Sequence, residues 1–172
     1  MSELHKFLFD GLPVRGMLVR LTDTWTEILR RRASNSTTGA YAEPVRDMLG
    51  EMVAAATLMQ ANIKFDGSLV LQIFGDGPVK LAVVEVQADL ALRATATVVG
   101  PVGDAATLSQ MVNETNEGRC AITLDPCPRP PSAALSYERA YVYCAVAVNP
   151  LCSRRRNCNC PASRVELPFE VI

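Results

Sequence analysis

The chain has little histidine and little net charge, and each scarcity excludes a class of function. His5 is the only histidine in 172 residues. This removes sites that need two imidazoles, such as a two-histidine zinc protease, and weakens any serine–histidine–aspartate proposal. The formal net charge is −1, so a broad nucleic-acid-binding surface built on excess positive charge is not expected.

Long apolar runs are also missing. The longest uncharged stretches, 52–63 and 140–153, are shorter than the roughly 18 residues that a transmembrane helix requires. The N-terminus carries Glu3 with no long apolar core behind it, which is not the pattern of a secretory signal. We therefore expect a protein of the cytoplasm that has no membrane partner.

The composition that remains is that of a globular protein, but it changes near Pro126. Hydrophobic residues make up 49% of the chain and charged residues 20%, which argues against wholesale disorder. Residues 1–126 hold all ten glycines, with 11 basic and 15 acidic residues. Residues 127–172 hold no glycine, but they contain six of the 11 prolines and five of the six cysteines.

We interpret residues 127–172 as an atypical tail rich in arginine, proline and cysteine. This stretch has no glycine, the residue that adopts positive φ at turns without strain, and its prolines interrupt each candidate element. We expect it to be irregular. Its composition is typical of a reading-frame change in a GC-rich gene, and a genuine cysteine-rich tail is the alternative.

The first elements are a strand and a short helix. Alternation over 14–21 predicts the strand. Thr24 and Glu27 have the spacing of a capping box, so a helix is expected to follow and to bury Trp25, Ile28 and Leu29. Arginines 30–32 would then complement the C-terminal dipole of this helix, with an anion site as the alternative.

After a polar loop over 33–42, the clearest helix begins at Glu43-Pro44, where proline is tolerated in the first turn. Its apolar residues share one face at helical spacing: Val45, Met48, Leu49, Met52, Val53, Ala56 and Met59. An ordinary core face is the simpler interpretation. The three methionines leave open an adaptable peptide-binding face.

From Ile63 the hydrophobic period changes to two, and strands over 69–74 and 79–86 flank Gly75-Asp76-Gly77-Pro78. This pattern predicts a β-hairpin. The glycines do not form a phosphate loop, because a Gly-Lys-Ser/Thr ending before a helix is missing. Asp66 and Asp76 are expected to bond the backbone of their own turns.

Three further elements complete the prediction. Alternation over 92–99 predicts a strand with small residues inward. Asp104 is expected to cap a helix that buries Leu108, Met111 and Val112. Residues 120–124 read as a last strand. The order β-α-α-β-β-β-α-β predicts an α+β fold with a mainly antiparallel sheet, β-hairpins, and helices packed on the sheet.

No catalytic or cofactor-binding constellation emerges from the residues. His5 is interpreted as structural, and Cys120 as an ordinary strand residue. Cys158 and Cys160 lie close enough in sequence to share one metal ion, and arginines 154–156 would favour their thiolates. Because no Cys-x-x-Cys pair accompanies them and the other tail cysteines are irregularly spaced, we assign no metal ligand.

Several short motifs follow one another in a recognisable order. Phe7-Leu8-Phe9 precedes Val14-Arg15-Gly16, and five more follow: Lys64-Phe65-Asp66-Gly67, Gly75-Asp76-Gly77-Pro78, Leu81-Ala82-Val83, Arg93-Ala94-Thr95-Ala96 and Ile122-Thr123-Leu124. Over about residues 4–126 the chain resembles the redox-regulated 33 kDa heat-shock chaperone family, also called the 33 kDa chaperonin. The combination of the Phe-Asp-Gly and Gly-Asp-Gly-Pro motifs is fairly specific to that family.

The resemblance implies a cytoplasmic holdase rather than an enzyme, one that binds unfolded client proteins under oxidative or heat stress. In the family, a C-terminal zinc domain with Cys-x-Cys and Cys-x-x-Cys ligands keeps the protein inactive. Oxidation forms disulfides and releases the zinc, and dimerisation accompanies activation. The similarity stops near residue 126, so we expect residues 1–126 to be an incomplete N-terminal domain. The zinc role is not carried onto Cys158 and Cys160, and no cofactor is expected.

The function predicted from the sequence is therefore that of a holdase, with apolar faces of the 69–86 hairpin and the 43–59 helix binding clients. An exposed sheet edge would favour association into a homodimer. Two alternatives remain open: a small cysteine-based metal-binding or redox protein, and a nonfunctional truncated fragment.

Overall fold

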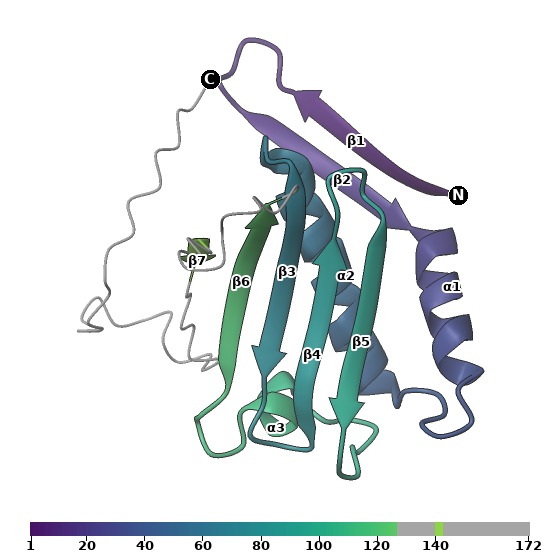
Figure 1. Ribbon diagram of the computed structural model, residues 1–172. Helices are drawn as coiled ribbons and strands as arrows, with labels where there is room; N and C mark the ends of the chain where they lie inside the picture. Colours follow the sequence, from purple (N-terminus) through teal and green to yellow (C-terminus); the bar gives the residue numbers. More distant parts are fainter. Residues whose placement is uncertain (127–139, 143–172) are drawn as a thin grey trace, which may run out of the picture.

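The computed structural model describes residues 1–126 and 140–142, and it contains two antiparallel sheets (Figure 1). The small sheet pairs β1 (Ser2–Leu8) with β2 (Arg15–Leu21). The larger one has the order β5-β4-β3-β6-β7. Its strands are β3 (Gly67–Phe74), β4 (Val79–Val86), β5 (Leu92–Val98), β6 (Arg119–Pro126) and β7 (Ala140–Val142).

Three helices accompany the sheets: α1 (Thr22–Ala33), α2 (Glu43–Asn62) and α3 (Leu108–Val112). In Figure 1, α2 lies behind the larger sheet and α1 lies beside β5, while the β1–β2 hairpin crosses one end of the molecule. No helix in the described part of the chain combines the length and apolar character needed to cross a membrane. The arrangement confirms the predicted α+β fold.

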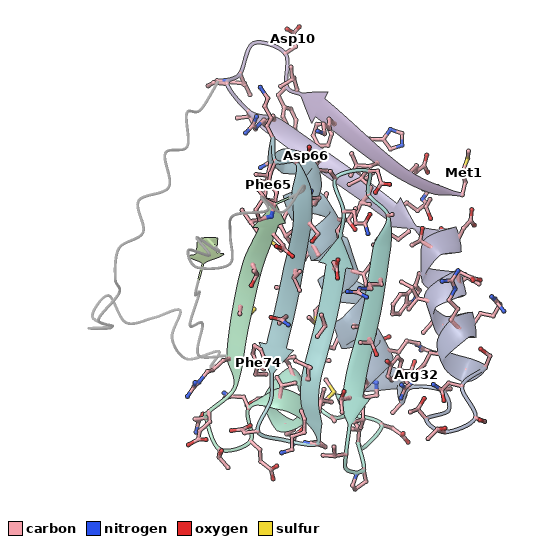
Figure 2. All side chains as sticks on the ribbon, in the orientation of Figure 1. Met1, Asp10, Arg32, Phe65, Asp66 and Phe74 are labelled. Atoms are coloured by element: carbon pink, nitrogen blue, oxygen red, sulfur yellow. The ribbon has the colours of Figure 1, made fainter. Side chains whose placement is uncertain are left out.

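The N-terminal hairpin was not predicted in full. The sequence pattern indicated a strand over 14–21 but only an apolar lead-in over 4–9. The structure pairs all of Ser2–Leu8 with Arg15–Leu21 in antiparallel register. Figure 2 marks the turn between the two strands with Asp10. Strand β1 lacks clean alternation, so the partner strand rather than local periodicity decides its conformation.

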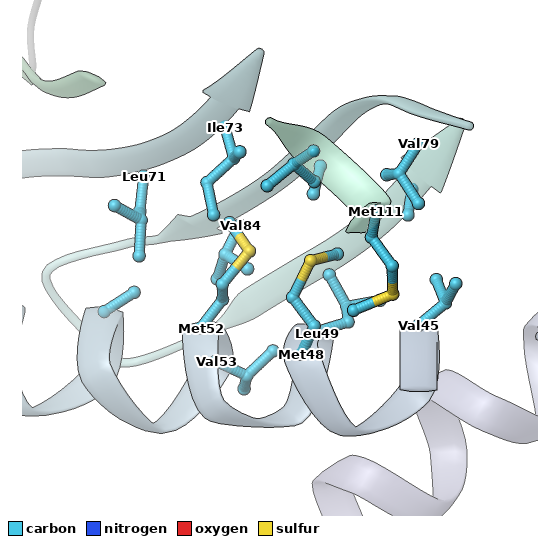
Figure 3. Close-up of a cluster of buried hydrophobic side chains, with 14 of the residues drawn as sticks. Val45, Met48, Leu49, Met52, Val53, Leu71, Ile73, Val79, Val84 and Met111 are labelled. Atoms are coloured by element: carbon cyan, nitrogen blue, oxygen red, sulfur yellow. The ribbon is translucent and has the colours of Figure 1, made fainter. Parts of the chain in front are cut away.

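The hydrophobic core lies between α2 and the larger sheet, and the predicted stripe of α2 supplies six of its 16 buried residues (Figure 3). Val45, Leu49 and Val53 are fully buried. They face the inner side of the sheet, where Leu71 lies opposite Val84 on β4 and Ile122 on β6. This side is the one that strand alternation assigns to burial. Met59 at the end of the stripe is only half-buried.

The predicted capping box of α1 is wrong. The helix begins directly after β2, with Leu21 at its N-cap and no side-chain cap. Thr24 is therefore inside the helix, where its N–H donates to Ser2 Oγ at 3.1 Å. Glu27 binds Arg30 and Arg31 instead of the helix start. The sequence motif fails because β2 continues directly into the helix, which places the N-cap three residues earlier than predicted.

The predicted cap of α3 is also wrong. Thr107 caps the helix and forms a complete capping box with Gln110, so Asp104 has no part in it. Met111 and Val112 are buried as expected, but Leu108 remains 41% exposed. Thr107 lies three residues after Asp104 and is the better cap, because Gln110 at N3 can bond back to its N–H.

At the C-terminal side, β6 matches the predicted strand, but it is not the last. Strand β7 pairs with β6, with Tyr141 opposite Thr123. The prediction that residues 127–172 form an irregular tail otherwise falls on residues outside the described ones.

Candidate functional surface

The described residues contain no cluster that suggests catalysis or metal binding. Within residues 1–126 no three histidine, cysteine, aspartate or glutamate side chains are grouped so that they could hold a metal ion. Cys120 is half-buried on the side of β6 that packs against the core. Cys158 and Cys160 lie outside the described residues, so what was predicted of them stays a prediction.

His5 and the arginine triplet lie at the surface. His5 Nε2 is 3.0 Å from Glu3 Oε2, and the histidine side chain is 60% exposed. Arg30 and Arg31 bind the Glu27 carboxylate at 2.7 Å each, and these hydrogen bonds lower the pKa of Glu27 to about 2. For Arg30 and Arg31, this internal pairing supports the interpretation of a solvated helix end over that of an anion site.

Asp76 has a different role from the one predicted. Its carboxylate lies in the β3–β4 turn but binds the loop that precedes β6. Oδ1 accepts the Glu114 N–H at 2.7 Å, and Oδ2 accepts the N–H groups of Thr115 and Glu117 at 2.9 Å each. The Thr115 hydroxyl adds a fourth bond at 2.5 Å. The carboxylate therefore joins two loops that are nearly 40 residues apart.

These bonds favour the charged form of Asp76. The hydrogen bond from Thr115, followed by those from the backbone N–H groups, holds the pKa of the Asp76 carboxyl well below its ordinary value of 3.8. A carboxylate stabilised in this way contributes to folding above its unfolded-state pKa, and the contribution is lost as the pH falls toward the lower folded-state value.

We expect Asp76→Asn to lower the urea midpoint at pH 7. The side-chain NH2 group of asparagine would face backbone N–H groups that the carboxylate oxygens now accept, and two donors cannot bond each other. We also expect the variant to lose less of its stability than the parent protein between pH 5 and pH 2. Urea titrations at a series of pH values measure both effects.

Asp104→Asn is the matched control, since Asp104 is an exposed loop aspartate. Glu3 and Glu27, whose pKa values are also lowered, are unchanged in both variants. If Asp76→Asn lost as much stability on acidification as the parent protein, the carboxylate would not hold the two loops together.

The most distinctive surface feature is a group of apolar side chains on the β1–β2 hairpin. Six of the ten large hydrophobic residues that the structure exposes lie within 7–18. We call this group the apolar hairpin tip: Phe7, Leu8, Phe9, Leu12, Val14 and Leu18. Leu8 is 80% exposed and Leu12 61%. Single exposed apolar residues are ordinary, but several within one hairpin mark an interaction surface.

The strand geometry holds the aromatic rings of the tip in place. Phe7 lies opposite Gly16 on β2, and a Cβ at Gly16 would come within 2.3 Å of the Phe7 ring. Glycine therefore lets this ring lie directly against the neighbouring strand. Phe9 meets Phe7 edge to face, with ring centroids 5.6 Å apart, and its N–H donates to the Val14 carbonyl at 3.0 Å. The exposed rings are thus preorganised.

A second apolar area lies on the outer face of the larger sheet, the face turned away from α2. By register, Val83 lies opposite Gln72 and Leu81 lies opposite Phe74, and alternation turns these side chains away from the core. Phe74 is 45% exposed. Among the described residues no helix covers this face, and Figure 1 shows it toward the viewer with α2 behind.

The apolar faces that the sequence analysis expected to bind clients are mostly buried. The helix stripe and the inner face of the β3–β4 hairpin pack against each other, with Leu49, Leu69 and Val84 at 1% exposure or less. That expectation was wrong for these faces because each is the partner of the other. The hairpin tip was missed, although Phe7-Leu8-Phe9 followed by Leu12 and Val14 is an apolar run without the period of a buried element.

Comparison with known proteins places these features in a family. Residues 2–134 match the family model described as "Hsp33 protein". The chain is 48% identical over 125 residues to a 33 kDa chaperonin from Chromobacterium violaceum. It is 39% identical to one from Aliivibrio salmonicida and 40% identical to one from Photorhabdus laumondii, again over 125 residues. These alignments cover 73% of this chain but only 39–40% of each relative, so the chain spans about two fifths of their length.

Proposed function

Because this chain belongs to the Hsp33 family, we propose that it is a holdase, a chaperone that binds unfolded polypeptides without acting on them as an enzyme. The relatives carry the name 33 kDa chaperonin. We further propose that it works in the cytoplasm on unfolded client proteins rather than on nucleic acid or membranes. Homodimer formation and redox control stay predictions; five of the six cysteines lie outside the described residues.

The observation that carries the proposal is the apolar hairpin tip. An unfolded chain exposes apolar side chains that a folded protein buries, and a holdase must offer them apolar surface of its own. Each Å² of apolar surface removed from water contributes roughly 25 cal/mol. The tip offers aromatic and aliphatic groups on one two-stranded ribbon, whose opposite end packs against α1 and α2.

The tip can bind clients without unfolding the domain. Its side chains are exposed while the residues of α2 and β3 that form the core are not. Lys6 Nζ donates to the Ala61 carbonyl at 2.6 Å, which ties the hairpin to the end of α2. The hairpin is thus anchored next to the tip, and the exposed rings gain a rigid support. Rigid apolar anchors lose little conformational entropy on binding.

We expect the protein to suppress the aggregation of a chemically unfolded enzyme at equimolar ratio, measured by light scattering. The double variant Phe9→Ser, Leu12→Ser should require roughly tenfold more protein for the same suppression, because burial of each lost side chain contributes about 1.5–3 kcal/mol. Both residues are at least half-exposed, so the fold should persist, as far-ultraviolet circular dichroism would check.

Val99→Ser, Leu108→Ser is the matched control, since it removes exposed apolar groups from outside the tip. It should suppress aggregation as well as the parent protein. Absence of suppression by the parent protein would overturn the holdase proposal. Equal loss in both double variants would show that exposed apolar groups act without regard to position, and that the tip is not the client surface.

A further inference from the structure

Strand β5 is an edge of the larger sheet in the described part of the chain, and a groove of about 480 Å³ runs between this edge and α1. Residues 92–95 of β5 line one side of the groove. Ile28 and Arg31 of α1 line the other, and Tyr41 lines one end. Figure 1 shows β5 and α1 side by side in this region. The edge strand is therefore flanked by a channel rather than covered.

Tyr41 already imitates a neighbouring strand at one position of this edge. Its hydroxyl accepts the Ala96 N–H at 2.8 Å and lies 3.3 Å from the Ala96 carbonyl, to which it donates. These are the two bonds that a paired residue of another strand would make. Because outward-pointing backbone groups recur every second residue along a strand, those of Ala94 and Leu92 also face the groove.

The outward groups of Ala94 have no hydrogen-bond partner among the described residues, since its only recorded pairing is with Val84 of β4. A row of unpaired backbone groups at a sheet edge is a template for another strand. The groove beside it supplies the space that such a strand needs. Tyr41 limits the free part of the edge to its first half.

The charges around the groove specify the kind of strand. Three arginines line it, and two of them are already ion-paired: Arg31 with Glu27, and Arg93 with Glu85 of β4. The third, Arg32, has no ion pair in the described structure. The guanidinium of Arg32 stacks over the Tyr41 ring at 4.2 Å. Its Nε is buried and has no hydrogen-bond partner in the described structure. Arg32 therefore leaves the lining with one positive charge that no carboxylate balances and one N–H donor without an acceptor.

We propose that an extended, acidic segment of an unfolded client adds to β5 as a further strand, bonded to the outward groups of Leu92 and Ala94. Side chains of such a strand alternate between the two faces of the sheet. Carboxylates of such a strand that face α1 would meet Arg32, which has no ion pair in the described structure, whereas Arg31 and Arg93 already pair with Glu27 and Glu85. The identity of this occupant rests on the proposed holdase function. A second copy of this chain fits less well, because edge-to-edge pairing would bring together two grooves that each carry the unbalanced charge of Arg32.

The test uses a fluorescein-labelled peptide of alternating valine and glutamate, and a matching peptide of valine and lysine. Fluorescence anisotropy should show binding of the acidic peptide, and at least about tenfold weaker binding of the basic one. Ala94→Pro should weaken binding of the acidic peptide about tenfold, because it removes an outward N–H that the pairing with β4 does not use. Ala94→Ser keeps this N–H and should bind like the parent protein.

Amide hydrogen exchange provides a second measurement that does not depend on the fold of Ala94→Pro. Addition of the acidic peptide to the parent protein should slow exchange at the amides of Leu92 and Ala94. Equal affinity of Ala94→Pro and Ala94→Ser, or unchanged exchange at both amides, would overturn the inference. The inference would also be overturned if the parent protein dimerised without peptide and Ala94→Pro abolished the dimer. The occupant of the β5 edge would then be a second copy of this chain.

The same proteins are assayed for suppression of aggregation, which separates this inference from the proposed function. If the parent protein suppresses aggregation but does not bind the acidic peptide, the edge inference fails and the holdase proposal stands. If it binds the peptide through β5 without suppressing aggregation, the edge site stands and the holdase proposal fails.

Discussion

Replacement of Leu49 by alanine is expected to lower the free energy of unfolding by about 3 kcal/mol. Leu49 is fully buried in the middle of α2. Figure 3 shows it between the helix and the sheet, next to the side chains of Met48 and Met111. Truncation removes the transfer free energy of the side chain and leaves a cavity that the surrounding core fills only in part.

The size of this effect follows from the architecture. Helix α2 is the element that joins the two sheets, since it contacts β3, β4 and β5 on one side and β2 on the other. On the β2 side, Trp25 of α1 lies over Gly50, where a Cβ would come within 3.3 Å of the indole ring. A loosened α2 therefore weakens the contact of the larger sheet with the hairpin as well as the core itself.

Urea denaturation monitored by circular dichroism measures the effect. Leu12→Ala is the control because Leu12 lies on the hairpin tip at 61% exposure, and it should change stability by no more than about 0.5 kcal/mol. Similar values for the two substitutions would contradict the packing of α2 against the sheet.

Gly75→Ala is expected to destabilise the protein by about 3 kcal/mol, the upper part of the range for overpacking. A Cβ at this position would lie 2.0 Å from the Val79 carbonyl oxygen and 3.1 Å from Val112 Cα. Both are backbone atoms, so the main chain itself would have to move. The Gly75 N–H also donates to the Lys80 carbonyl at 2.9 Å, which closes the turn.

This movement has a second consequence, because Asp76 is the next residue. A shift of the turn would carry the Asp76 carboxylate away from the N–H groups of Glu114, Thr115 and Glu117. We therefore expect Gly75→Ala to release the loop before β6 as well, seen as faster amide exchange over 114–117. Urea titration gives the loss of stability itself.

Gly103→Ala is the matched control, since no atom lies within 4 Å of a Cβ at that position. It should leave stability unchanged or raise it slightly, because alanine restricts the unfolded chain more than glycine does. If both glycine substitutions had the same effect, the close approach at Gly75 would not be a constraint on the fold.

Local sequence predicts those helices and strands that have a strong hydrophobic periodicity and clear signals at their ends. The stripe of α2 recurs at helical spacing behind Glu43-Pro44, and the helix begins at Glu43. The alternation of β3 and β4 around Gly75-Asp76-Gly77-Pro78 produces the antiparallel hairpin. In both cases the residues that decide the structure are close neighbours along the chain, so burial of one face follows from spacing alone.

The surface on which the proposed function depends was not predictable in the same way. The helix and hairpin faces that looked free in sequence are buried, because strand order places Leu71 and Val84 directly opposite α2. Whether an apolar face is exposed depends on what lies against it, and local spacing does not carry that information.

By itself the amino-acid sequence determined the family, the α+β class, the long helix and the central hairpin, because their signals are periodic and local. Only the tertiary structure decided that Ser2–Leu8 is a strand, that Asp76 binds a loop nearly 40 residues away, and that Tyr41 closes half of the β5 edge. Each of these is a pairing between distant segments. Such a pairing contributes to stability only after the rest of the fold has brought the two segments together.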